Sequence, residues 1–218
     1  MTLRSDYERA KTLLDQAIVA QPNVAKFHRN LSIVLERMHK IDEALTSART
    51  AAGLAPADPL VLDQLCTLEL EKKNTVTALA CYERLKAIEP LDDLSQTYYA
   101  LALFESGKAD ESLTILEKIA QTTAPPMDAL NALGVVYYTK KRLKDAVAAF
   151  KSAVEMSPEQ YELRYNLAVA ELARQNRAAA ISQYNILKTG DPRLANKLYR
   201  MIFSDKLLSV GDLKNAKR

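Results

Sequence analysis

The stretch "LNALGVVYYTKKRLKDAVAAFKSAVEMSP", residues 130–158, holds two mainly apolar segments that are joined by a short basic turn. In each segment, apolar residues recur at spacings of three and four, which is the period of an amphipathic helix. The small residues Gly134 and Ala146 stand where two antiparallel helices would cross closely, and Pro158 follows the second segment. The stretch therefore predicts two helices that pack against each other.

The same unit recurs every 34 residues along the 218-residue chain. The prolines that share this register are Pro22, Pro56, Pro90, Pro158 and Pro192. A column of small residues consists of Ala10, Ala44, Ala78, Ser112, Ala146 and Ala180. No proline lies inside a segment of helical period, where it would cost about 3 kcal/mol. We therefore predict an all-α chain built from repeated antiparallel helix pairs.

The register also predicts where each helix pair begins. Five complete pairs start near residues 25, 59, 93, 127 and 161, with single helices at 5–20 and 192–209, all within one domain over residues 1–218. Asp58 before Pro59 and Asp191 before Pro192 are typical helix starts, and Ser157 with Gln160 predicts a capping box. The final segment "GDLKNAKR", residues 211–218, has the pattern of a new second helix.

A 34-residue unit with these columns resembles the tetratricopeptide repeat (TPR). The best-matching repeat carries the Leu-Gly pair of the family and its other consensus positions, namely Leu133, Gly134, Tyr137, Ala146, Phe150, Ala153 and Pro158. The next repeat has Glu171 where the family has a tyrosine, and the tryptophan of the family is absent throughout. The resemblance covers nearly the whole chain and implies a right-handed superhelical α-solenoid.

Composition and charge exclude several classes of protein. The net charge is only +3, so the basic run 140–144 is better explained as a solvated turn than as a nucleic-acid surface. No stretch of 18 apolar residues occurs, so we predict no membrane insertion and a cytoplasmic chain. Cys66 and Cys81 form no metal-binding or redox motif, and we predict reduced, half-buried thiols.

The sequence contains no recognisable catalytic motif. His28 and His39 are the only two histidines, and His28 falls in a packing column. No phosphate-binding glycine loop, nucleophile elbow or zinc-binding helix is present, and paired acids such as Asp92 and Asp93 suit helix starts. We therefore predict a protein that is not an enzyme and that needs neither a cofactor nor a metal.

The family resemblance implies that the first helices of the pairs line a groove that binds a protein or peptide partner. Aromatic side chains and a partial ladder of amides map to that groove, where rings supply contact area and amides pair with a peptide backbone. The predicted site residues are Asn30, Gln64, Tyr98, Leu101, Phe104, Asn131, Tyr138, Tyr165, Asn166, Tyr199 and Arg200. The carboxylate clamp of chaperone-binding relatives matches at only two of five positions, so chaperone C-termini are not predicted partners.

Two functions remain open at this point. The first is a non-enzymatic interaction module that binds an extended peptide or a partner helix, and the alternative is a regulatory or oligomerisation segment of a larger enzyme. The last predicted helix is strongly apolar for an end of an array, which also predicts possible end-to-end self-association. Its apolar residues are Leu198, Met201, Ile202, Leu207 and Leu208.

Overall fold

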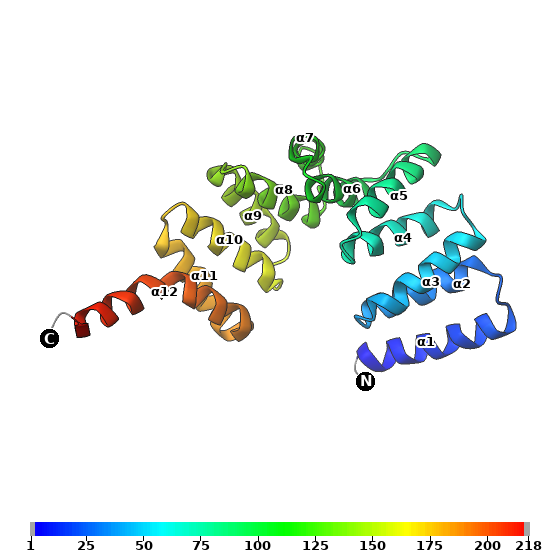
Figure 1. Cartoon of the computed structure of the whole chain (residues 1–218), viewed down its shortest axis with the longest axis horizontal. Helices are drawn as coiled ribbons and strands as arrows, with labels where there is room; N and C mark the ends of the chain where they lie inside the picture. Colours follow the sequence, from blue (N-terminus) through cyan, green and yellow to red (C-terminus); the bar gives the residue numbers. More distant parts are fainter. Residues whose placement is uncertain (1–2, 216–218) are drawn as a thin grey trace. The chain divides into compact units, whose positions relative to one another are not determined.

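The computed structural model describes the backbone of residues 3–215 and the side chains of residues 6–203. Within this part of the chain, all regular secondary structure is helical, which confirms the predicted all-α class (Figure 1). The helices are α1 (Leu3–Ala20), α2 (Ala25–Arg37), α3 (Ile41–Leu54), α4 (Pro59–Glu71), α5 (Thr75–Ile88), α6 (Asp93–Glu105), α7 (Ala109–Ala120), α8 (Met127–Thr139), α9 (Leu143–Met156), α10 (Tyr161–Ala173), α11 (Arg177–Gly190) and α12 (Pro192–Asn215).

The helices form two compact units, and the boundary between the units lies within α7. Unit 1 comprises Met1–Ser112 and unit 2 comprises Leu113–Arg218. In each unit the chain forms antiparallel pairs, such as α2 with α3 and α8 with α9, and successive pairs stack on one another. We call α2, α4, α6, α8, α10 and α12 the first helices and the others the second helices. Both units are therefore solenoid stacks of helix pairs.

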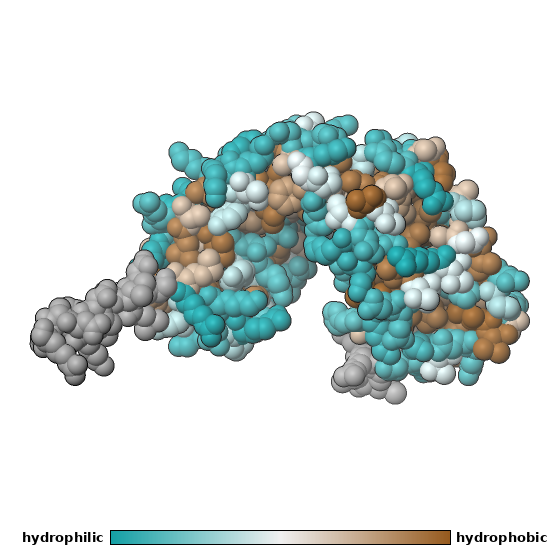
Figure 2. Space-filling model, in the orientation of Figure 1, coloured by the Kyte–Doolittle hydropathy of each residue, from teal (hydrophilic) through white to brown (hydrophobic). Residues whose placement is uncertain are grey.

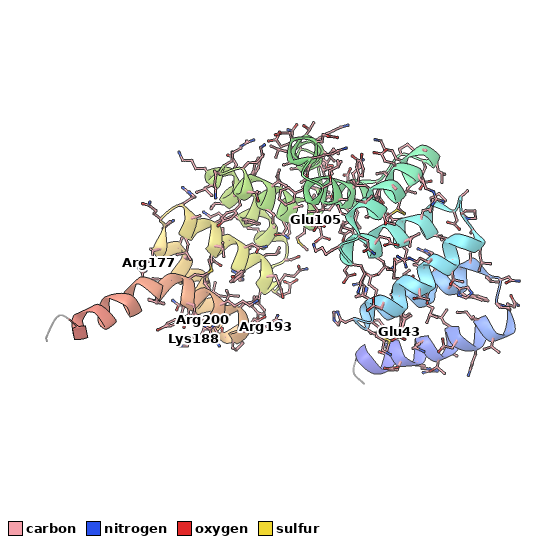
Figure 3. All side chains as sticks on the ribbon, viewed as in Figure 1. Glu43, Glu105, Arg177, Lys188, Arg193 and Arg200 are labelled. Atoms are coloured by element: carbon pink, nitrogen blue, oxygen red, sulfur yellow. A yellow bond between two sulfur atoms is a disulfide. The ribbon has the colours of Figure 1, made fainter. Side chains whose placement is uncertain are left out.

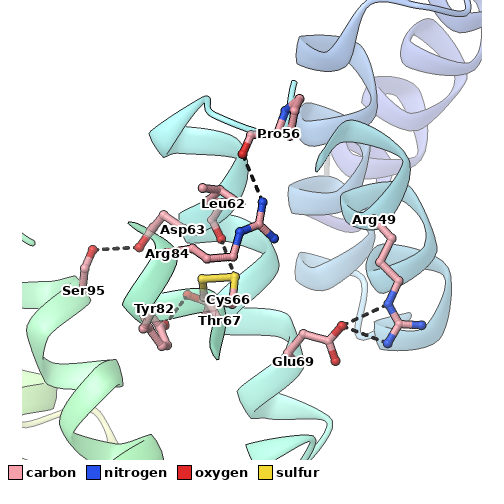
Figure 4. Close-up of a disulfide and its surroundings, with 11 residues drawn as sticks. Arg49, Pro56, Leu62, Asp63, Cys66, Thr67, Glu69, Tyr82, Arg84 and Ser95 are labelled. Atoms are coloured by element: carbon pink, nitrogen blue, oxygen red, sulfur yellow. Dashed lines mark hydrogen bonds and ion pairs between the residues drawn. A yellow bond between two sulfur atoms is a disulfide. The ribbon is translucent and has the colours of Figure 1, made fainter. Parts of the chain in front are cut away.

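A disulfide bond joins the two helices of one pair in unit 1. Cys66 of α4 and Cys81 of α5 are bonded, their Cα atoms lie 5.3 Å apart, and their exposed fractions are 0% and 5% (Figure 4). The predicted reduced, half-buried thiols are therefore wrong. The two cysteines lie 15 residues apart in the sequence, and the turn between α4 and α5 brings them face to face. Because this contact arises only when the pair closes, the spacing alone gave no disulfide motif.

Gly134 has the role in unit 2 that its column predicted. A Cβ atom at Gly134 would lie 2.6 Å from the Cδ1 and Cε1 atoms of Phe150, well inside van der Waals contact. The missing side chain thus lets the Phe150 ring of α9 lie directly against the backbone of α8. Ala146, on the same face of α9, is fully buried. The close crossing of α8 and α9 is confirmed.

Polar side chains link four of the second helices to the first helix that follows. On the second helices, these side chains occupy a single position of the 34-residue register: Arg49, Glu83, Glu117 and Lys151. Where that place holds a cation, a buried glutamate lies opposite it. Arg49 donates to Glu69 at 2.8 Å, and Lys151 lies 3.9 Å from Glu171. These glutamate side chains are only 2% and 3% exposed, so removing a cationic partner would leave a buried carboxyl group without its ion pair.

Where the same place holds a glutamate, a tyrosine lies opposite. The Tyr99 hydroxyl donates to Glu83, and the Tyr137 hydroxyl donates to Glu117 at 2.8 Å. Burial and the hydrogen bond to Glu117 together raise the pKa of Tyr137 to about 12, so its hydroxyl stays protonated and remains a donor. The residue on the second helix therefore decides whether the link is an ion pair with a glutamate or a hydrogen bond from a tyrosine.

Helix starts agree with the sequence in two of three cases. Asp58 accepts hydrogen bonds from the backbone of Leu60 and Val61, and Asp191 accepts one from Leu194 at 3.1 Å. The capping box at Ser157 is wrong, because α10 begins only at Tyr161 and its N-cap residue, Gln160, makes no side-chain cap hydrogen bond. The chain between α9 and α10 turns instead through backbone hydrogen bonds such as that of the Gln160 amide with the Ser157 carbonyl.

The last helix is longer than predicted. Helix α12 continues to Asn215, so a new second helix does not begin at residue 211. Leu198 and Ile202, which the sequence placed on an exposed apolar end, are 0% and 3% exposed and belong to the core cluster of α10, α11 and α12. Met201 is 46% exposed, whereas Leu207 and Leu208 lie outside the residues whose side chains are described.

Candidate peptide-binding surface

All of the predicted site residues lie on first helices, and we call the surface that these helices form the first-helix face of each unit. The residues in unit 1 are Asn30, Gln64, Tyr98, Leu101 and Phe104, and those in unit 2 are Asn131, Tyr138, Tyr165, Asn166, Tyr199 and Arg200. Tyr199 and Arg200 are exposed, and the others are half-buried. The two faces differ in what their side chains contact.

On unit 1, polar side chains connect neighbouring first helices directly. The Gln64 amide of α4 donates to Glu36 of α2 at 2.7 Å. The Ser95 hydroxyl of α6 donates to Asp63 of α4 at 2.7 Å (Figure 4). At the far end of these helices, Lys73 pairs with Glu105. The Gln64 amide, which the sequence suggested for a peptide backbone, thus donates a hydrogen bond within the protein.

Burial affects two carboxyl groups on this face. Desolvation raises the pKa of Asp63 above its usual range, and nearby Asp92 adds to this shift, while the hydrogen bond from Ser95 opposes it. Desolvation also raises the pKa of Glu71, with a further contribution from the charge of Glu36. Both groups are consequently harder to ionise than exposed acids.

Two of the predicted groove residues of unit 1 also contact the core. Tyr98 and Leu101 of α6 are half-buried and pack against a buried cluster of Leu70, Ala78 and Ala102. Phe104 is half-buried as well. Tyr98 and Leu101 therefore contribute contacts between α4, α5 and α6.

Unit 2 has a hollow on its first-helix face. A pocket of about 200 Å³ is lined by Val135, Tyr138, Phe150, Tyr165, Asn166, Val169 and Met201. The lining comes from α8, α10 and α12, with Phe150 reaching it from α9. Only Asn166 and the two tyrosine hydroxyl groups are polar. The pocket therefore gathers three of the predicted site residues around an apolar cavity.

Two polar contacts shape the pocket. The Asn166 amide of α10 donates to the Asn131 oxygen of α8 at 3.0 Å, so the pair bridges two first helices. Across the pocket, the Tyr165 hydroxyl lies 3.6 Å from the Met201 sulfur, which is a weak acceptor. Each amide keeps polar atoms for which the described residues provide no hydrogen-bond partner. An amide that can both donate and accept suits the backbone of an extended peptide.

The remaining predicted residues of unit 2 lie on α12 beside the pocket. The rings of Tyr199 and Phe203 have centroids 4.6 Å apart, and Tyr184 of α11 lies 5.9 Å from Tyr199. These rings therefore stack mainly on one another. Arg200, also on α12, is exposed (Figure 3).

Four of the seven residues that line the pocket lie outside the predicted set, and for two of them, Phe150 and Met201, the register did not indicate the first-helix face. Phe150 belongs to a second helix and reaches the first-helix face because Gly134 has no side chain to block it. Met201 occupies a register column that is buried in earlier repeats, such as Leu133 and Leu167, yet it is 46% exposed here. The glycine was a usable signal for the first residue, whereas nothing local marked the second.

The face shown in Figure 2 is mixed, with apolar patches lying between hydrophilic residues. In the part of the chain that the structure describes, no helix is long and apolar enough to cross a membrane. Among the same residues, no group of three or more His, Cys, Asp or Glu side chains is placed to hold a metal ion.

Comparison with known proteins agrees with the repeat pattern. The family described as "Psidin, N-terminal TPR repeats region" matches residues 69–184, more than half of the chain, and a further tetratricopeptide repeat family matches residues 4–59. The chain belongs to the tetratricopeptide repeat family. Proteins built from such repeats generally act as protein-interaction scaffolds.

Among curated proteins, the chain is 26% identical over 190 residues to the BBSome complex member BBS4 of Bos taurus, covering 82% of this chain and 34% of that protein. It spans between about a quarter and a third of the length of the curated relatives that it matches.

Solved structures share the fold at low sequence identity. A tetratricopeptide repeat protein from Parabacteroides merdae has a TM-score of 0.73 at 17% identity, over 94% of this chain and 82% of that one. YrrB, described as a TPR protein with an unusual peptide-binding site, has a TM-score of 0.56 at 16% identity, over 86% of this chain and 97% of that one. These likenesses establish the fold.

Proposed function

We propose that the first-helix face of unit 2 binds an extended segment of a partner protein and takes one apolar side chain into its pocket. The observation that carries this proposal is the pocket itself, which combines apolar walls with the amides of Asn131 and Asn166 at its edge. Its volume of about 200 Å³ is below the range of about 300–1,000 Å³ typical of small-molecule sites. It therefore suits a single side chain better than a whole metabolite.

The arrangement divides the work of binding between two kinds of side chain. Tyr138 and Tyr165 present rigid rings that lose little conformational entropy on binding. The Asn131–Asn166 pair offers a donor and an acceptor to the peptide groups on either side of the anchored residue. The peptide-binding site named for YrrB is a property of that protein, but it agrees with this use of the fold.

A binding assay with peptide pools tests the proposal. The probes are fluorescein-labelled nine-residue peptides with amidated C-termini, a central Leu and flanks randomised over Gly, Ser and Gln. A matched pool has Ser at the centre. We expect the Leu pool to bind the full chain, as measured by fluorescence anisotropy, and the Ser pool to bind much more weakly.

The double variant Tyr138→Ala/Tyr165→Ala should weaken binding of the Leu pool by about tenfold or more, because both rings contact the anchored side chain. Met156→Ala serves as the control, since Met156 is an exposed apolar residue of α9 outside the pocket. Equal binding of the Leu and Ser pools, or loss of the folded state in the double variant alone, would contradict the proposal.

A further inference from the structure

The charges around the pocket of unit 2 are not balanced. Helix α12 carries Arg200 next to the pocket residue Met201, and in the 34-residue register Arg200 occupies the place that Asn166 holds on α10. Lys141, in the turn after α8, lies 5.9 Å from the ring centroid of Tyr138, another pocket residue. Both cations are exposed, and neither pairs with a carboxylate among the side chains that the structure describes.

The carboxylates of α10, the helix between these two cations, are already paired. Glu162 lies 3.9 Å from Arg193, and Glu171 is buried against Lys151 and Arg174. None of the pocket-lining residues is acidic. The two carboxylates of α10 therefore pair with other cations and not with Arg200 or Lys141.

We infer that the peptide held by unit 2 carries an acidic side chain close to its apolar anchor, and that Arg200 pairs with this side chain. The inference rests on the proposed function and adds the chemical class of the ligand to it. The apolar pocket fixes one residue of the peptide, and the exposed guanidinium beside it selects a carboxylate, which it can bind through two hydrogen bonds.

The acidic residue should lie close to the anchor in the peptide, because Arg200 is next to Met201 on α12 and Met201 lines the pocket. An extended chain advances about 3.3 Å per residue, so an acidic residue within about three positions of the anchor comes within reach of the Arg200 side chain.

The experiment compares peptide pools that share the central Leu and differ in the charge of their flanks. The neutral pool described above is matched by a pool with flanks of Asp, Glu, Gly and Ser and by a pool with flanks of Lys, Arg, Gly and Ser, all amidated. We expect the acidic pool to bind about two- to fivefold more tightly than the neutral pool at low salt, the effect of one exposed ion pair. The basic pool should bind more weakly than either, and added salt should reduce these differences.

Two charge-reversal variants assign the preference to Arg200. Arg200→Glu should reverse the order in which the acidic and neutral pools bind. Lys118→Glu makes the same change in net charge on α7, at the other end of unit 2 (Figure 1), and should leave the acidic preference unchanged.

The outcomes separate the two proposals. If the neutral Leu pool binds but the acidic pool binds no better, or if both variants change the preference equally, this inference is overturned and the proposed function stands. Binding that appears only when the peptides carry a free C-terminal carboxylate also overturns it. If no Leu pool binds, both the function and the inference fail.

Discussion

The first-helix faces of the two units use the same register positions in opposite ways. On unit 1, the Gln64 amide of α4 donates to Glu36 of the preceding first helix, α2, so this amide is bonded within the protein. On unit 2, Asn166 holds the same register position, but its neighbour is Asn131, and an apolar pocket opens beside the pair. The comparison shows that a register position fixes where a side chain lies, whereas its neighbours decide whether it is available to a partner.

Side-chain length and neighbouring charge account for this difference. Gln64 has one more methylene than Asn166 and meets a carboxylate, so it forms a charge-assisted hydrogen bond across two helices. Asn166 meets a neutral amide, which accepts one hydrogen bond and leaves further polar atoms of both side chains available. Unit 1 thus gains internal cross-links, and unit 2 keeps groups for recognition.

The largest expected effect concerns the disulfide that stabilises unit 1. The variant Cys66→Ala/Cys81→Ala should lower the free energy of unfolding of this unit by about 3 kcal/mol, the effect of removing a link across 15 residues. Hydrogen exchange measured by mass spectrometry should show faster exchange in α4 and α5 and little change in α9 and α10.

Thiol alkylation of the unfolded, unreduced wild-type chain provides the direct check on this bond. No alkylated cysteine is expected without reductant, and two are expected after reduction. Two alkylated cysteines before reduction, or equal destabilisation of α9 and α10 in the variant, would contradict this account of unit 1.

An intermediate effect is expected when the two amides are exchanged for leucine. Gln64→Leu removes a hydrogen bond to a carboxylate and should destabilise unit 1 by about 1–2 kcal/mol, without changing binding of the neutral Leu peptide pool. Asn166→Leu should instead weaken that binding several-fold while costing at most about 1 kcal/mol of stability, because it removes a neutral hydrogen bond on a half-buried surface. Denaturant melts and anisotropy titrations on both variants measure the two effects. If Gln64→Leu impairs binding as strongly as Asn166→Leu, the two faces are not distinct.

The smallest expected effect is a pH dependence that belongs to unit 1. Because desolvation raises the pKa of Asp63, the folded state holds the proton of this group more tightly than the unfolded chain does. Its contribution to stability is complete below the ordinary aspartate pKa of about 4 and is lost as the pH rises through the raised folded pKa. Asparagine does not ionise, so Asp63→Asn does not lose this stability as the pH rises. The variant should be slightly more stable than the wild type at pH 7, with little difference near pH 3. Thermal melts at both pH values provide the measurement, and an equal effect at the two values would contradict it.

Much of the fold could be predicted from the sequence because its signals are local. The prolines and the small-residue column defined the repeat, and the first helices begin at Ala25, Pro59, Asp93, Met127 and Tyr161. The capping aspartates Asp58 and Asp191 were also identifiable, since a cap acts within three residues of its own position. The capping box at Ser157 failed because backbone hydrogen bonds satisfied the turn without it.

The candidate site was predictable only in part. The register placed Tyr138, Tyr165 and Asn166 on the first-helix face, and the structure brings all three to one pocket. The same reasoning placed Tyr98 and Leu101 on the first-helix face of unit 1, where they are half-buried and also pack against Leu70 and Ala102. The register fixes the direction of a side chain from its own helix, but it does not show which side chains of the neighbouring helices lie against that side chain.

The sequence by itself determined the helical period, the 34-residue repeat and the residues that each first helix presents, because these depend on spacing along one segment of chain. Only the tertiary structure decided that Cys66 and Cys81 form a bond, that Gln64 is occupied by Glu36, and that a pocket remains between Val135, Tyr165 and Met201. Each of these outcomes depends on distances between separate helices, and those distances are set by the packing of all the side chains between them.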